Sequence, residues 1–161
     1  MKMLAILATA FLVPHVLPSS GAIAQTTTTP AVTDYADSPL LPGSWSYLTV
    51  PGGSNARFTD PTGTIRISVG CNKTSRGVTI ARTSTAPAAS LSIWTSTSSR
   101  SQPAMFEQSA QRVIATFNAQ DTMLDAIVFS RGRFAVSMPG APAFVIPTGP
   151  EPARIVEDCR G

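Results

Sequence analysis

A single pair of cysteines, Cys71 and Cys159, behind an export signal constrains this chain more than any other feature. Exported proteins fold in an oxidising compartment, where an even and minimal set of cysteines is typical of one structural disulfide. The alternative is two unpaired buried thiols. A disulfide removes both sulfurs from the chemistry open to the protein, so the pair restricts function as well as fold.

The first 24 residues have the pattern of a cleaved signal peptide. Lys2 gives the positive start, residues 3–13 are apolar, and residues 22–24 (AIA) match the small-x-small cleavage pattern. The apolar stretch is shorter than the roughly 20 residues that a spanning helix needs, so a retained membrane anchor is the weaker alternative. We expect a periplasmic or secreted protein that begins at Gln25 and has no stable membrane insertion.

Cleavage removes side chains that enzymes use for acid–base and nucleophilic chemistry. His15, the only histidine, leaves with the signal, and Lys73 is then the only lysine. Catalytic arrangements that need histidine, and zinc sites built from histidine and cysteine, are therefore excluded. Lys73 lies in an apparent turn, which favours a solvated side chain over a Ser–Lys dyad. We predict no catalytic residue, no metal site and no cofactor.

The charge balance argues against a nucleic-acid partner. Removal of Lys2 leaves eleven of the twelve basic residues, against nine acidic ones. Nucleic acids and anionic membranes bind clustered basic faces, and this excess is slight. The sequence does not indicate an oligomeric state.

The mature chain divides into a lead-in and one domain. Residues 25–43 are rich in threonine and proline and show no apolar period, which is typical of a flexible segment. Residues 44–161 are numerous enough to bury a hydrophobic core as a single domain.

Short strands joined by tight turns dominate the domain. Residues 65–71 alternate apolar and polar side chains with the period of a half-buried strand. Further strands are predicted over 44–50, 55–59, 77–83, 90–97, 112–119, 133–138 and 143–147. Tight turns between consecutive strands favour antiparallel pairing. Residues 102–119 are ambiguous because their apolar residues also lie at helical spacing; we predict a loop followed by a strand.

Two short helices complete the predicted fold. Asp121 can cap a helix whose last turn holds Arg131 and whose left-handed end is Gly132. Residues 151–160 form a terminal helix with Pro152 in its first turn. We expect an α+β domain with a mostly antiparallel sheet, curled toward a small barrel or sandwich, with one inserted and one C-terminal helix.

These elements place both cysteines on core-facing surfaces. Cys71 continues the inward face of the strand over 65–71. Cys159 follows the apolar stripe of Ile155 and Val156 on the terminal helix. The two sulfurs are then well placed to meet.

Two groups of side chains are candidate binding residues. Arg131 and Arg133 flank a glycine and could hold a carboxylate, a phosphate or a sugar acid in bidentate geometry. Their alternative role is structural, as a helix-end arginine and an outward strand arginine. Trp45 and Tyr47, with Trp94, could form a binding platform, although aromatic residues in a small β domain more often complete its core.

One pair of carboxylates is a candidate for glycoside chemistry. Asp121 and Asp125 are one helical turn apart, as a catalytic carboxylate pair could be. Helix capping by Asp121 and a first-turn charge at Asp125 explain both residues without catalysis.

Several motifs carry a family resemblance. These are Phe129-Ser130-Arg131-Gly132-Arg133-Phe134, Glu157-Asp158-Cys159-Arg160, Trp45-x-Tyr47 and Cys71. Over residues 45–161 the chain resembles a family of small, uncharacterised exported proteins of sphingomonads and related alphaproteobacteria. The resemblance implies periplasmic location and a lone disulfide, and it supplies no catalytic residue.

Together these features predict a non-enzymatic periplasmic domain that binds a protein or a cell-envelope component. A role like that of a lysozyme inhibitor is one form of this function, by fold analogy alone. The alternatives are a carboxylate-dependent hydrolase of a cell-wall or glycoside substrate, and a purely structural envelope protein.

Overall fold

The computed structural model describes residues 35–161, so the predicted signal peptide and residues 25–34 of the predicted flexible segment lie outside the described residues. The strands are β1 (Ser44–Val50), β2 (Gly53–Thr59), β3 (Ile65–Asn72), β4 (Gly77–Thr83), β5 (Ser90–Trp94), β6 (Ser99–Glu107), β7 (Arg112–Asn118), β8 (Arg133–Met138) and β9 (Ala141–Pro147). The helices are α1 (Thr122–Val128) and α2 (Pro150–Arg160). All strand pairs are antiparallel, in the order β1-β2-β3-β4-β7-β6-β5-β8-β9. The predicted α+β class is confirmed.

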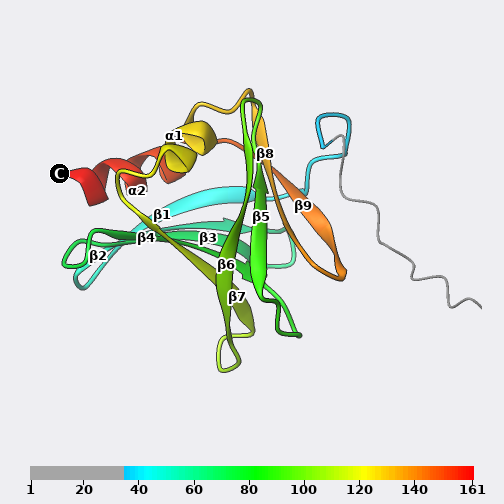
Figure 1. Ribbon diagram of the computed structural model, residues 1–161, viewed down its shortest axis with the longest axis horizontal. Coiled ribbons are helices and arrows are strands. Elements are labelled where there is room, and N and C mark those ends of the chain that lie inside the picture. Colours follow the sequence, from blue (N-terminus) through cyan, green and yellow to red (C-terminus); the bar gives the residue numbers. More distant parts are fainter. Residues whose placement is uncertain (1–34) are drawn as a thin grey trace, which may run out of the picture.

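We predicted a sheet curled toward a small barrel or sandwich. The sheet curls, but it does not close into a barrel. β1–β4 run across the direction of β5, β6, β8 and β9, with both helices on one side of β1–β4 (Figure 1). β1 and β9 stand at opposite ends of the strand order. They meet through the Trp45 indole, which donates to the Pro147 carbonyl oxygen at 2.8 Å. Just before β1, the Leu41 amide also donates to the Val145 carbonyl oxygen of β9 at 2.7 Å. We call this junction the β1–β9 seam.

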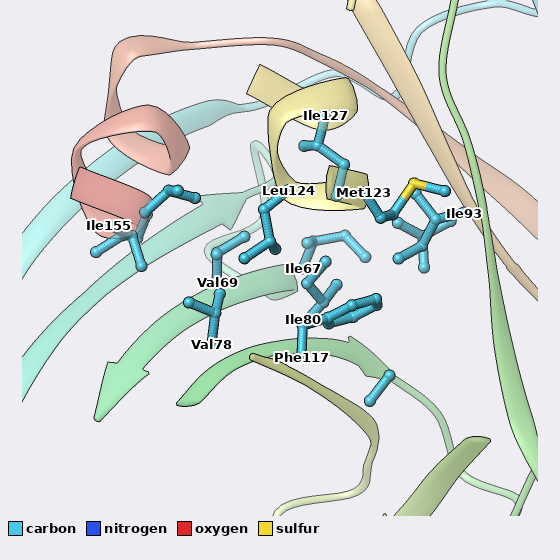
Figure 2. Close-up of a cluster of buried hydrophobic side chains, with 14 of the residues drawn as sticks. Ile67, Val69, Val78, Ile80, Ile93, Phe117, Met123, Leu124, Ile127 and Ile155 are labelled. Carbon is cyan, nitrogen blue, oxygen red and sulfur yellow. The ribbon is translucent and has the colours of Figure 1, made fainter. Parts of the chain in front are cut away.

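The hydrophobic core lies between the sheet and the two helices. Strand alternation turns apolar side chains of the central strands toward the helices, as predicted, and α1 and α2 supply the opposing side chains (Figure 2). The cluster includes Ile67, Val69, Val78, Ile80, Ile93, Phe117, Met123, Leu124, Ile127 and Ile155. Each fully buried aliphatic side chain contributes roughly 1.5–3 kcal/mol relative to an exposed one. Ile65, predicted to face inward, is exposed beside the register shift between β2 and β3.

Residues 99–118 form a hairpin of two strands, β6 and β7. The strand predicted over 112–119 is confirmed as β7, and the loop predicted before it is wrong. The half-buried positions of β6 include Arg100 and Gln102, and Pro103 lies within the strand. Polar residues at these positions leave no apolar alternation, so the usual signal of a strand is missing.

The two helices begin near their predicted starts. Asp121 caps α1 as predicted, since its side chain accepts a hydrogen bond from the Met123 amide at 2.8 Å. α1 ends earlier than predicted, with Phe129 as its C-cap. Arg131 is therefore not in the last turn of α1, and Gly132 takes its positive φ of 73° in the connection to β8.

The predicted disulfide is present. Cys71 on β3 and Cys159 on α2 are joined, with 5.5 Å between their Cα atoms, and both residues are buried. The bond attaches the terminal helix to an internal strand of the sheet. In residues 35–161, no helix has the length and apolar character needed to cross a membrane.

Candidate functional site

The two arginines predicted to bind a ligand have different surroundings. Arg131 is exposed, and its backbone amide donates to the Ser96 hydroxyl at 3.1 Å. The Arg133 guanidinium donates from Nη1 to the carbonyl oxygens of Ala36 and Ser38, at 2.8 and 2.9 Å. Arg133 thus holds the segment that leads into β1, whereas no side-chain hydrogen bond of Arg131 is found within residues 35–161.

The predicted tryptophans pack and donate within the domain. Trp45 contacts Phe58 edge-on, with 5.4 Å between ring centroids, and stacks on Phe134 at 6.5 Å. The Trp94 indole donates to the Ser137 hydroxyl at 3.1 Å. Both tryptophans are half-buried, and their contacts match the alternative role that we gave to aromatic residues in a small β domain.

Tyr47 lies between β1 and α2. Its hydroxyl donates to Asp158 Oδ2 at 2.7 Å, and the Arg154 guanidinium lies 4.1 Å from the ring centroid. The pKa of Asp158 is lowered, first by the Ser54 hydroxyl and then by the Tyr47 hydroxyl. These contacts attach the edge of the sheet to the terminal helix.

Each candidate catalytic carboxylate engages an arginine of its own. Asp121 Oδ2 accepts from Arg100 at 2.7 Å, and Asp125 Oδ1 accepts from Arg160 at 2.7 Å. Burial raises the pKa of Asp121, but the hydrogen bonds from Arg100 and the Met123 amide outweigh it, so the net pKa is lowered. A lowered pKa disfavours a role for Asp121 as a general acid near neutral pH. Asp121 caps α1 and both carboxylates form ion pairs, so each has a structural role.

The face of the sheet turned away from the helices carries mostly polar and small side chains, together with Ile114 of β7. We call it the open face. Its residues on the neighbouring strands β2, β3, β4 and β7 include Asn55, Arg57, Arg66, Ser68, Gly70, Thr79, Ala81, Thr83, Arg112 and Thr116. The strand register sets Arg57 opposite Ser68, and Ser68 opposite Ala81. Small side chains therefore lie beside Arg57 across the sheet.

A hollow of about 420 Å³ lies on the open face. Three arginines from different strands line it, namely Arg57 on β2, Arg66 on β3 and Arg112 on β7. Thr83 on β4 is paired with Arg112 in the strand register and also lines the hollow. We call this the arginine hollow.

The arginines of this hollow differ in their charge partners. Arg112 pairs with Glu107 at 2.6 Å. The Arg57 Nε donates to the Asn55 side-chain oxygen at 3.1 Å, and Arg57 makes no ion pair within residues 35–161. The positive charge of Arg57 is therefore not offset by any carboxylate of the described chain.

Arg66 is held by a strongly engaged carboxylate. Asp60 Oδ2 accepts from the Arg66 Nε at 2.7 Å, while its Oδ1 accepts from the Thr62 hydroxyl, the Thr62 amide and the Thr64 amide. The Thr62 hydroxyl is the largest of the causes that together hold the pKa of Asp60 well below its usual range. Asp60 thus stays ionised at neutral and mildly acidic pH, and Arg66 keeps its position.

A second cavity, of about 450 Å³, shares Arg66 and Thr83 with the arginine hollow. It lies between residues 84–87, which follow β4, and the turn over 138–141 between β8 and β9. Arg82 of β4 also lines it. We call it the Arg82 cavity.

Arg82 is a buried cation, with 2% of its surface exposed. Its Nη1 donates to the Val136 carbonyl oxygen at 2.8 Å, and its Nη2 donates to the Pro142 carbonyl oxygen. The guanidinium lies 3.9 Å from the ring centroid of Phe144. Its Nε has no hydrogen-bond partner, and Arg82 makes no ion pair in the described chain. Burial lowers the pKa of Arg82 to about 10.

Neither Arg82 nor the arginine hollow was predicted from the sequence. A usable signal for Arg82 was its register, because it is two residues beyond Ile80 and four beyond Val78 on the inward side of β4. The signal for the hollow was the polar positions of each strand's alternation. The apolar positions identify the core, and the polar positions between them mark the opposite face.

Within residues 35–161, no three His, Cys, Asp or Glu side chains gather in a way that could hold a metal ion. No protein-family model, no curated protein and no solved structure matches this chain. The resemblance to exported alphaproteobacterial proteins therefore rests on the sequence motifs alone.

Proposed function

We propose that this protein is a non-enzymatic periplasmic domain that binds an anionic component of the cell envelope on the open face of its sheet. The observation that carries the proposal is the arginine hollow, where Arg57, Arg66 and Arg112 line one space of about 420 Å³. The export signal and the disulfide support an oxidising compartment.

The chemistry of the hollow favours carboxylate or phosphate groups. A guanidinium presents five N–H donors in a planar fork that matches both groups. The ion pairs of Arg66 and Arg112 each occupy Nε, and their terminal nitrogens have no hydrogen bond within the described chain. Arg57 adds a charge without an acidic partner. The site therefore offers both donors and net attraction to an anion.

The spacing of the arginines favours a polymer over a single ion. Arg57 and Arg112 come from β2 and β7, which are three strand intervals apart in the sheet. Neighbouring strands lie about 4.8 Å apart, so the two backbones are separated by about 14 Å. Small side chains such as Ser68 and Ala81 lie between them. A chain with repeated negative groups can cross this floor and meet more than one arginine.

Binding to two envelope materials tests the proposal. The mature, oxidised protein is sedimented with cell-wall sacculi, which present carboxylates, and separately with lipopolysaccharide, which presents phosphates. We expect saturable binding to at least one material, and the two arms identify the anionic group. Amidated sacculi or dephosphorylated lipopolysaccharide should then bind much less.

Matched variants locate the site. Arg57→Gln combined with Arg112→Gln should weaken binding by about tenfold or more, since each lost charge-assisted hydrogen bond is worth about one factor of ten. Arg131→Gln removes an exposed arginine outside the arginine hollow and should leave binding unchanged. Equal losses in both variants, or binding that survives loss of the anionic groups, would reject this site.

A further inference from the structure

The Arg82 guanidinium has donor capacity that the described chain does not use. Two of its five N–H donors reach backbone carbonyl oxygens, and its Nε has no partner although the residue is almost fully buried. A buried charge is costly unless it is paired and hydrogen-bonded. The position would therefore gain from an anion supplied from outside the chain.

The surroundings hold the guanidinium in one orientation. The carbonyl oxygens of Val136 and Pro142 bind separate terminal nitrogens, and the Phe144 ring lies against the guanidinium at 3.9 Å. These contacts connect β4 with β8 and β9, which are not its neighbours in the sheet. The side chain is thus fixed before any ligand arrives, which lowers the entropy cost of binding.

The Arg82 cavity, which residue Arg82 lines, has space for a small anion. Its volume of about 450 Å³ far exceeds that of a carboxylate group. One wall is the exposed turn at Pro139 and Gly140, where Gly140 has a positive φ of 76°. Arg66, whose Nε pairs with Asp60, also lines the cavity.

We propose that the Arg82 cavity is a second binding site, which takes a carboxylate group on the guanidinium of Arg82. A carboxylate is planar and has two acceptor oxygens, so it can meet Nε and a terminal nitrogen of one guanidinium together. Nε has almost no accessible surface in the free protein, so this binding requires the turn over 138–141, which lines the cavity, to shift and admit the carboxylate. The site goes beyond the envelope binding proposed above, because it needs only a small monocarboxylate.

Nuclear magnetic resonance of the ¹⁵N-labelled mature protein tests this directly. Acetate is the probe, with acetamide and chloride at matched ionic strength as comparisons. We expect acetate to cause saturable shifts of the Arg82 Nε–H signal and of the Gly140 and Ala141 amide signals. Acetamide and chloride should leave these signals in place. Absence of a saturable acetate shift, or the same shift with chloride, would overturn the proposal.

Variants separate this site from the arginine hollow. Arg82→Lys keeps the charge but loses the planar fork, and acetate affinity should fall by about tenfold or more. The pair Arg57→Gln and Arg112→Gln should weaken envelope binding by about tenfold or more and leave the acetate shifts intact. If Arg82→Lys does not fold, side-chain correlation experiments assign the Nε–H signal, and the wild-type titration decides alone.

Discussion

Tyr47 donates its hydroxyl hydrogen bond to Asp158 Oδ2 at 2.7 Å and so joins the edge strand β1 to the helix α2. Tyr47→Phe removes this bond and should lower the free energy of unfolding by about 1 kcal/mol. Urea unfolding at neutral pH measures the change. Ser46→Ala, on the exposed side of the same strand, serves as the control and should have a smaller effect.

The effect of Tyr47→Phe should depend on pH. The Ser54 hydroxyl, and after it the Tyr47 hydroxyl, lower the pKa of Asp158 in the folded protein. The resulting stabilisation is present above the unfolded pKa of about 3.9 and is lost as pH falls through the lower folded value. The difference between wild type and Tyr47→Phe should therefore shrink in acid. An equal difference at neutral pH and in strong acid would contradict this account.

Asp60→Asn tests the carboxylate that holds Arg66. The pKa of Asp60 is lowered, chiefly by the Thr62 hydroxyl, so its contribution to stability is present above the unfolded pKa and is lost only in strong acid. Asp60→Asn should lower the free energy of unfolding at neutral pH. This difference from wild type should disappear as pH falls through the folded pKa of Asp60. Chemical unfolding across pH measures the difference, and Asp37→Asn is a control outside this network. A deficit that does not change with pH would show that the charge of Asp60 is not responsible.

Removal of the disulfide should be the most destabilising of these changes. Loop-closure entropy for a cross-link that spans 88 residues corresponds to about 4–5 kcal/mol. Cys159→Ser and Cys71→Ser should have similar effects, because each removes the same bond. Native exported protein should show no free thiol and a mass about two hydrogens below that of the reduced chain. Titratable thiols in that protein would contradict the pairing.

Substitutions at Asp121 separate helix capping from catalysis. Asp121→Ala removes the acceptor of the Met123 amide and should cost about 1 kcal/mol in the free energy of unfolding. Asp121→Ser keeps a capping oxygen and should recover part of the loss. Thermal and urea unfolding compare the two variants. If Asp125→Asn abolished hydrolysis of a cell-wall or glycoside substrate, the hydrolase alternative would replace the binding role.

The strands predicted from sequence are those with apolar residues on one side. In β3, Ile67 and Val69 alternate with polar neighbours, and burial of one face makes that alternation visible in the sequence. In β6, Arg100 takes a half-buried position, where it pairs with Asp121 and lies over the Phe117 ring. The charge of Arg100 is paired by residues distant in the sequence, so the local sequence pattern does not reveal that this position is half-buried.

The binding surfaces could not be predicted for a related reason. Arg57 and Arg112 are 55 positions apart in the chain and lie on the same face only because β7 is placed beside β4. Arg131 and Arg133 looked more promising because they are close in sequence. Within residues 35–161 these two arginines have different surroundings, whereas strand order brought distant arginines to one hollow.

The β1–β9 seam implies a gradient of local unfolding across the domain. Within residues 35–161, each of its two strands has a strand partner on one side only. The Trp45 hydrogen bond bridges them, and Leu41, just before β1, bonds to β9. β3 has partners on both sides and carries the disulfide. Backbone amides of β1 and β9 should therefore exchange with deuterated solvent through partial opening, whereas those of β3 exchange only when the whole domain unfolds.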